Sequence, residues 1–142
     1  MKKVVLLLLA GVIAALFSTL GKSVIKKINE RQNSNSVMEM AQEISDEMNV
    51  GLPSQTDELM QMDITSVGPG KQFNFFYTFV TDITGSMSPE QFAAKARPQL
   101  TQSYRTNSKL ADFRKNGVAV RFCYRDMNGG AFADIVIKPS DL

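Results

Sequence analysis

Hydrophobic and polar residues follow three different patterns along this chain. Residues 4–20 form an almost unbroken apolar run, and the stretch after it is basic and polar. Further along, apolar residues recur every three to four positions or every second position, the spacings of amphipathic helices and half-buried strands. The pattern predicts an N-terminal hydrophobic helix as a signal or anchor segment in 1–21, a basic stalk and linker in 22–34, and an α+β globular domain in 35–142.

Helical periodicity marks two longer segments and one short segment of the globular domain. The first segment has apolar residues on one stripe at Val37, Ala41, Ile44 and Met48. The second starts with the capping pattern Ser88-Pro89-Glu90-Gln91 and repeats apolar residues at Phe92, Ala96, Leu100 and Tyr104. Pro98 lies inside it, and because proline removes a backbone donor we expect a kink or a split there. A short third helix ends at Asn116-Gly117.

Four stretches alternate between apolar and polar residues, as half-buried strands do. The first, 58–66, has Met60, Met62 and Ile64 on its apolar side. The second, 72–79, has Phe73, Phe75, Tyr77 and Phe79 on one side. Residues 118–125 and 131–137 supply the other two. The order helix-hairpin-helix-hairpin predicts a four-stranded antiparallel sheet with both helices on one face.

The amino-acid composition excludes several kinds of chemistry. The 142 residues contain no His and one Cys, which excludes Ser-His-Asp and Cys-His catalysis, His-containing zinc sites and an internal disulfide. Residues 1–28 carry five Lys and no acid, so the remainder has 11 Lys plus Arg (16 − 5) against 14 Asp plus Glu. Because the folded part is slightly acidic, we expect no nucleic-acid partner, and we also expect no cofactor and no metal.

The N-terminal apolar run is typical of an export signal, since Lys2 and Lys3 precede it directly. Its 17 residues would reach about 25 Å as a helix. Small residues at a cleavage site are missing, and no Cys near the run offers a lipid attachment site. We therefore predict an inner-membrane protein that crosses once through residues 4–20, with its C-terminal domain in the periplasm. The alternative is cleavage after Gly21, which would release a secreted or periplasmic protein.

Short patterns between residues 52 and 142 carry a resemblance. They are Leu52-Pro53 with Asp57-Glu58, Phe73-x-Phe75-x-Tyr77, Phe113-x-x-Asn116-Gly117-Val118, Phe122-x-Tyr124-x-Asp126 with Gly129, and Ile135-x-Ile137-x-Pro139-x-Asp141. With them the chain resembles a group of small exported, membrane-anchored bacterial proteins of uncharacterised function. Members of that group often hold two cysteines, where this chain has Tyr104 and Leu142. The resemblance therefore implies no disulfide here.

The candidate functional surface is the sheet face turned away from the helices. Alternation places on it Asp63, Gln72, Asn74, Phe76, Thr78, Arg121, Arg125, Asp134 and Lys138. Exposed aromatic rings and arginines are enriched at protein interfaces. We therefore predict a binding surface composed of Asn74, Phe76, Thr78, Arg121, Arg125 and Asp134. The alternative is a polar face that an antiparallel sheet exposes to solvent with no further role.

The single cysteine, Cys123, lies between Arg121 and Arg125 on the same face, and two interpretations of it are open. Neighbouring positive charge would make a thiolate reactive, whereas burial would leave an inert thiol. We favour the inert thiol, because the sequence offers no base and no second Cys to complete a mechanism.

Together these observations favour a non-catalytic, membrane-anchored binding or assembly-assisting module of the cell envelope that acts on a protein partner. One alternative is a His-free hydrolase or lyase that uses paired carboxylates, which would require Asp or Glu residues with raised pKa values in a pocket. Another alternative is an immunity or inhibitor protein, which would differ from the first reading only in its partner.

Overall fold

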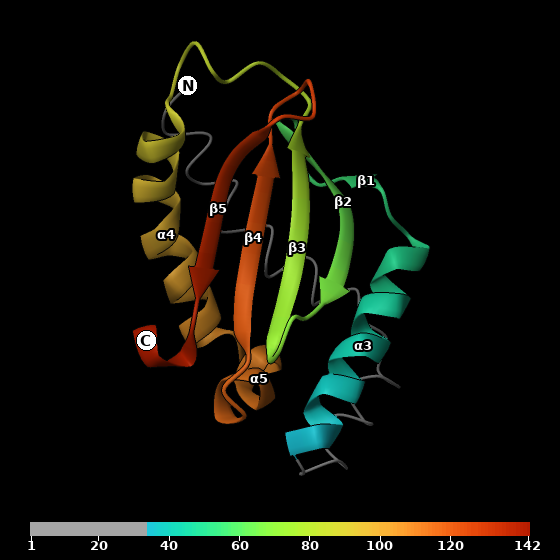
Figure 1. Ribbon diagram of the computed structural model, residues 1–142. Helices are drawn as coiled ribbons and strands as arrows, with labels where there is room; N and C mark the ends of the chain where they lie inside the picture. Colours follow the sequence, from blue (N-terminus) through green and yellow to red (C-terminus); the bar gives the residue numbers. More distant parts are fainter. Residues whose placement is uncertain (1–33) are drawn as a thin grey trace.

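The computed structural model describes residues 34–142, in which helices and strands build one sheet with helical cover (Figure 1). The main elements are α3 (Ser34–Val50), β1 (Ser54–Gln55), β2 (Met60–Val67), β3 (Gln72–Phe79), α4 (Pro89–Thr106), α5 (Ala111–Lys115), β4 (Ala119–Arg125) and β5 (Ala131–Ile137). Two single turns of 3-10 helix are η1 (Ser108–Leu110) and η2 (Pro139–Asp141). These elements confirm the α+β class.

The predicted N-terminal helix in 1–21 and almost all of the predicted linker lie outside the described residues. Helix α3 begins at Ser34, the last residue of the predicted linker. Within the described part of the chain, no helix combines the length and the apolar character that crossing a membrane would require.

The sheet has five strands in the order β1-β2-β3-β4-β5, and it is mixed. The prediction of a four-stranded, wholly antiparallel sheet is therefore wrong. The two predicted hairpins, β2–β3 and β4–β5, are confirmed. However, β3 and β4 are parallel neighbours, because α4, η1 and α5 return the chain to the end where β3 began. Strand β1 was not predicted, because its two residues are too few to show alternation.

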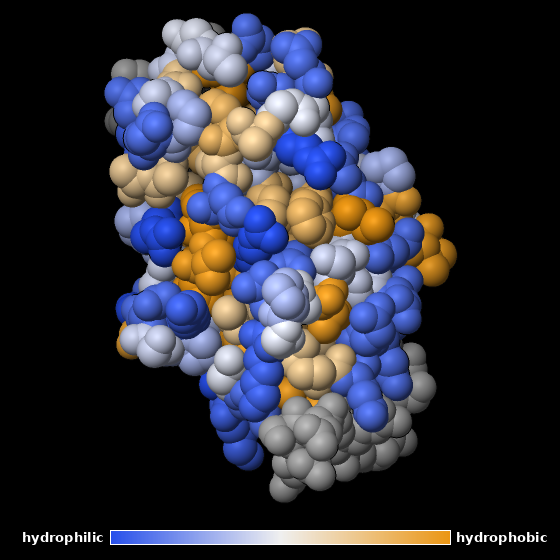
Figure 2. All heavy atoms as spheres, in the orientation of Figure 1, coloured by the Kyte–Doolittle hydropathy of each residue, from blue (hydrophilic) through white to orange (hydrophobic). Residues whose placement is uncertain are grey.

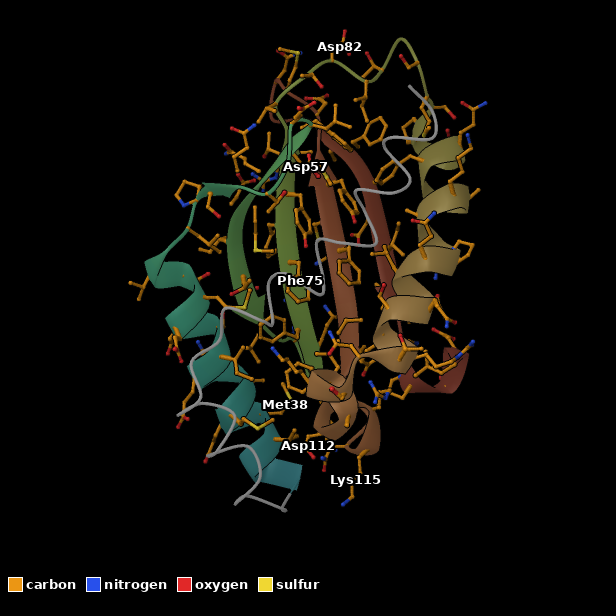
Figure 3. The ribbon with its side chains drawn as sticks, turned by 180° about the vertical axis from the view of Figure 1, so that it is seen from behind. Met38, Asp57, Phe75, Asp82, Asp112 and Lys115 are labelled. Atoms are coloured by element: carbon orange, nitrogen blue, oxygen red, sulfur yellow. The ribbon has the colours of Figure 1, made fainter. Side chains whose placement is uncertain are left out.

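Both long helices cover the same face of the sheet, as predicted. Helix α3 packs against β2 and α4 packs against β5, and their buried side chains join one hydrophobic core with the inward side chains of the four longer strands. Seen from the helical side, Phe75 lies on the central strands between the two helices (Figure 3). The opposite face of the sheet therefore has no helical cover within 34–142.

Helix α4 begins as its sequence predicts but does not break. The Ser88 hydroxyl accepts a hydrogen bond from the Gln91 amide, and the Gln91 side chain accepts one from the Ser88 amide, which forms a capping box. The helix continues through Pro98, so the predicted split is wrong. Proline removes one backbone hydrogen bond, and the four buried side chains that flank it on both sides hold the helix on the sheet.

A bulge at Asp63 changes which side chains of β2 face the core. The pairing with β3 shifts between Met62 and Ile64, so Asp63 is the extra residue. As a result Ile64, predicted in the core, is 50% exposed on the open face, while Thr65 is 1% exposed and points inward. Its hydroxyl lies 2.8 Å from the Ser45 hydroxyl, so the buried polar group has a partner.

Asn49 at the end of α3 completes the edge of β2 where β1 is too short to pair. Its side-chain oxygen accepts a hydrogen bond from the Thr65 amide at 2.8 Å, and its side-chain nitrogen donates one to the Thr65 carbonyl at 2.9 Å. A side-chain amide thus takes the place of a neighbouring strand and protects a backbone edge that would otherwise be open to pairing.

We expect Asn49→Ala to lower the free energy of unfolding by about 1–3 kcal/mol, because it removes the partner of both Thr65 backbone groups. The measurement is urea unfolding followed by circular dichroism. The matched control is Gln42→Ala on the same helix, whose amide bonds only to exposed Asp46 and should change stability by less than about 0.5 kcal/mol. Equal losses in the two variants would contradict this role of Asn49.

Candidate docking surface on the open sheet face

The strand register brings the predicted binding residues together on the open face. Between β3 and β4, Asn74 lies opposite Arg121, and Thr78 lies opposite Arg125. The same pairing puts Phe76 opposite Cys123, which lies opposite Asp134 of β5. Figure 2 views this side of the molecule, where apolar side chains are interspersed among polar ones.

Asn74 is on the predicted face but is only 2% exposed. Its amide nitrogen donates to the Ser66 hydroxyl at 3.0 Å and to the Gly68 carbonyl at 2.7 Å, and its oxygen accepts from Gln72 at 2.7 Å. All of these partners belong to the β2–β3 hairpin. Asn74 therefore stabilises the turn, and we leave it out of the docking surface proposed below.

Thr78 lies next to the bulge in β2 and shares its polar contacts. Its hydroxyl donates to Asp63 at 2.5 Å, and the second oxygen of Asp63 accepts from the Gln61 side chain at 2.7 Å. The Asp63 carboxylate therefore has a hydrogen-bond donor on each oxygen.

Arg121 and Asp134 form an ion pair across β4 and β5. The Arg121 Nε donates to both carboxylate oxygens, at 2.9 and 3.1 Å, and Nη2 donates to Oδ2. The hydrogen bond to Asp134 raises the pKa of Arg121. Because the side chains are 33% and 49% exposed, this pair contributes little to the stability of the fold. Its main effect is that the two opposite charges on the face cancel.

Cys123 is held as a neutral thiol between these charges. Its sulfur lies 3.9 Å from Asp134 Oδ1 and donates to it. Burial raises the pKa of the Cys123 thiol, and the Asp134 carboxylate raises it further, against the opposing effect of Arg121 and Arg125. A thiol with a raised pKa is a poor nucleophile near neutral pH. The geometry thus favours the inert interpretation of Cys123.

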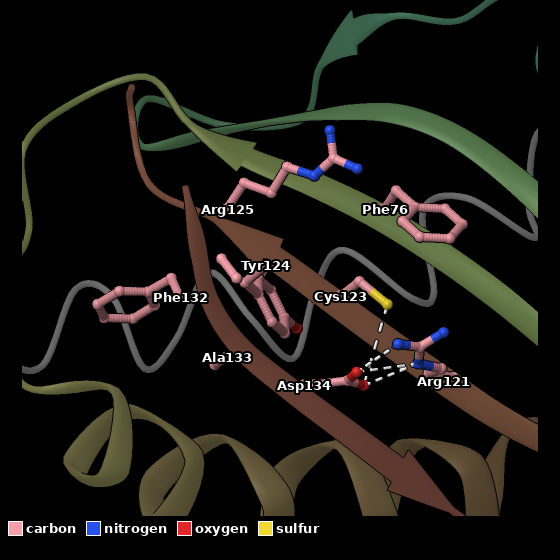
Figure 4. Close-up of a pocket in the computed structure, with 9 residues that line it drawn as sticks. Phe76, Arg121, Cys123, Tyr124, Arg125, Phe132, Ala133 and Asp134 are labelled. Carbon is pink, nitrogen blue, oxygen red and sulfur yellow. Dashed lines mark hydrogen bonds and ion pairs between the residues drawn. The ribbon is translucent and has the colours of Figure 1, made fainter. Parts of the chain in front are cut away.

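A hollow of about 330 Å³ opens on this face and is lined by residues of β3, β4 and β5 (Figure 4). Its walls are Phe76, Arg121, Cys123, Tyr124, Arg125, Ala131, Phe132, Ala133 and Asp134. Dashed lines in Figure 4 join Asp134 to Arg121 and Cys123, and none reaches Arg125. Among residues 34–142, the side chain of Arg125 makes no hydrogen bond and no ion pair, and its cross-strand neighbours Thr78 and Ala131 are uncharged. The hollow is therefore apolar in its walls and positive at one side.

Two register shifts change which residues belong to this surface. Ile64 faces solvent beside Phe76 because of the bulge in β2. A second register shift, between Tyr124 and Arg125, makes Phe132 the extra residue in β5. Alternation would place Phe132 on the open face with Asp134, but it is 8% exposed and its ring belongs to the core, although it also lines the hollow. Strict alternation assigns faces by counting every second residue, so one inserted residue reverses the assignment of everything after it.

Three carboxylates outside this face, Asp57, Asp82 and Asp126, accept hydrogen bonds from backbone amides close to them in the chain. Asp57 accepts hydrogen bonds from the amides of Leu59 and Met60, and Asp82 accepts two from Thr84, which lower the pKa of Asp82. Asp126 accepts from two amides of its own hairpin turn. In the described residues no group of three or more His, Cys, Asp or Glu side chains is arranged to hold a metal ion. These carboxylates therefore serve local turns.

Comparisons with known proteins place this fold. Residues 22–131 match the family described as "Domain of unknown function (DUF8479)". No curated protein matches the sequence. Three solved structures are similar in fold. The pilotin EpsS of the type 2 secretion system of Vibrio vulnificus has a TM-score of 0.61 at 15% identity, and the match covers 76% of this chain and 93% of EpsS.

The other two structures agree with the first in extent. A candidate secreted protein from Pseudomonas aeruginosa has a TM-score of 0.62 at 14% identity, with 76% of this chain and 94% of that chain covered. The type II secretion system pilotin AspS from Vibrio cholerae has a TM-score of 0.57 at 16% identity, with 77% and 94% covered. Likeness at this identity shows a shared fold.

Proposed function

Since the chain belongs to the family described as a domain of unknown function (DUF8479), we propose a function from its fold and its open face. The protein is a non-catalytic, exported protein that assists the assembly of a cell-envelope complex. The partner is a protein of that envelope, such as a secretin, and it docks on the open face. Two of the three similar folds belong to pilotins of secretion systems, which supports an assembly role over an enzymatic one.

One observation carries this proposal: apolar side chains remain uncovered in the middle of the polar open face. Ile64 is 50% exposed, and it lies opposite Phe76, which is half-buried. An uncovered aliphatic and aromatic pair surrounded by polar residues is the composition of an interface centre with a polar rim. Tethering through residues 4–20, with the domain in the periplasm, remains part of the proposal and would keep this face near the membrane.

The proposal predicts that position 76 contacts one envelope protein in living cells. Phe76 is replaced by photoreactive p-benzoyl-phenylalanine in the full chain, and irradiated cells are separated into soluble and membrane fractions. We expect one discrete cross-linked product in the membrane fraction, which mass spectrometry identifies as a subunit of a secretion assembly.

The matched control carries the same photoreactive residue at Glu47, which is exposed on the outer side of α3. It should give no such product. The proposal fails when position 76 yields no product, or when positions 76 and 47 yield the same one.

A further inference from the structure

We propose that the hollow beside Arg125 recognises an acidic side chain of the partner, an Asp or Glu that stands next to an apolar side chain in an internal segment of that protein. This inference rests on the proposed function, because it names the chemistry that the open face selects. It concerns the surface made by Ile64, Phe76 and Arg125 together with the hollow, which is called the docking surface below.

The charges at the hollow select a carboxylate. Three charged residues line it, and Arg121 is already bound to Asp134 by three hydrogen bonds, so this pair adds no net charge. Arg125 supplies the remaining charge of +1 and has no partner among residues 34–142. The bulge carboxylate of Asp63 accepts hydrogen bonds from Gln61 and Thr78 instead. A guanidinium with free donors binds a carboxylate with two parallel charge-assisted hydrogen bonds.

The apolar walls require an apolar group close to that carboxylate. Phe76 borders the hollow on the open face, and Phe132 and Ala133, which pack in or against the core, also line it. A volume of about 330 Å³ is at the lower end of the range for small-molecule pockets, so it suits one or two side chains better than a substrate. Ile64 extends the apolar strip across β2, so a partner segment can cover several strands at once.

The sheet geometry favours an acidic side chain over the C-terminal carboxylate of a partner. Backbone amides of a strand point in the plane of the sheet toward the neighbouring strands, and β4 is paired on both sides. The face therefore offers a carboxylate no backbone donors of the kind that capture chain termini. A side-chain carboxylate needs only Arg125, and the segment that carries it can pass over the open face without ending there.

Selection from a random peptide library tests this inference. A phage-displayed library of twelve-residue peptides is panned against the full chain in detergent micelles, and enriched peptides are synthesised with a fluorescent label. We expect enriched sequences to contain Asp or Glu within two positions of an aromatic or aliphatic residue. Fluorescence anisotropy should show that Arg125→Glu weakens binding about tenfold or more, and that replacing the peptide's Glu by Gln has a similar effect.

The controls separate this inference from the proposed function. Arg105→Glu makes the same charge change on exposed α4 and should leave binding within about twofold. If Phe76→Ser weakens binding and Arg125→Glu does not, the face docks a partner and acid recognition is overturned. If the enriched peptides are not acidic, acid recognition is likewise overturned. If neither variant weakens binding, both the inference and the docking surface fail. Thermal melts of each variant confirm that the comparison is between folded proteins.

Discussion

Raising the pH from about 9 to about 11 should remove about 4 kcal/mol from the free energy of unfolding of this domain. The cause is that all three tyrosines of the chain, Tyr77, Tyr104 and Tyr124, are 2% exposed or less. Burial raises the pKa of Tyr77 and of Tyr124 well above the ordinary value, and it raises the pKa of Tyr104 to about 12 although the charge of Arg114 acts in the opposite direction.

The sign of the effect follows from proton binding in the two states. In the unfolded chain each tyrosine titrates near pH 10, whereas in the folded protein each keeps its proton to higher pH. Between these values the unfolded state binds fewer protons, so its free energy falls relative to the folded state as the pH rises. The loss falls almost entirely in the one pH unit above pH 10, at about 1.4 kcal/mol for each tyrosine, so the three together give about 4 kcal/mol. This is close to the whole stability of a marginally stable small domain.

Tyrosinate absorbance measures this directly, because the chain has no Trp and no exposed Tyr in the described part. We expect the phenolate signal to rise together with loss of the near-ultraviolet circular dichroism, above pH 10, and to titrate near pH 10 in concentrated urea. Tyr124→Phe is the matched variant and should reduce the pH dependence by about a third. Phenolate absorbance that grows while the tertiary signal persists would show that the rings titrate in the folded state.

Much of this sheet could be predicted from the sequence, because burial on one face imposes a period of two. Alternation correctly placed the two hairpins and assigned Phe76, Thr78, Arg121, Arg125 and Asp134 to one face. It could not reveal the direction of β4 relative to β3, since alternation is the same in parallel and antiparallel strands. The available clue was the helix between the two strands, which is the usual connection of parallel neighbours.

The site was less predictable than the fold, because its properties depend on register. Arg121 lies opposite Val136 and reaches Asp134 diagonally, whereas Arg125 lies opposite Ala131, so the ion pair and the isolation of Arg125 both depend on the register of β4 and β5. Neither the bulge at Asp63 nor the burial of Asn74 against the β2–β3 turn has a signature in composition or periodicity, although the glycines and proline of that turn do mark its place. Both changed the docking surface, one by adding Ile64 and the other by removing Asn74.

Phe92→Ala should lower the free energy of unfolding by about 3–5 kcal/mol, because Phe92 attaches α4 to the sheet. Its ring, 1% exposed, is 4.8 Å from the Tyr124 ring, 5.5 Å from the Phe79 ring and 5.6 Å from the Phe132 ring, measured between centroids. The three partners belong to β4, β3 and β5, so one helical side chain contacts three strands through edge-on or inclined pairs. Truncation removes these contacts and leaves a cavity.

Urea unfolding followed by far-ultraviolet circular dichroism measures this loss, and Phe76→Ala is the control, since it deletes the same ring from the half-buried open face. We expect the control to cost less than about half as much, because a partly exposed side chain gives up less burial. Tyr124 and Phe132 belong to both the ring cluster and the wall of the hollow. Phe92→Ala should therefore also weaken peptide binding, although it changes no residue of the docking surface itself. Equal stability losses at positions 92 and 76 would show that the cluster does not hold the helix.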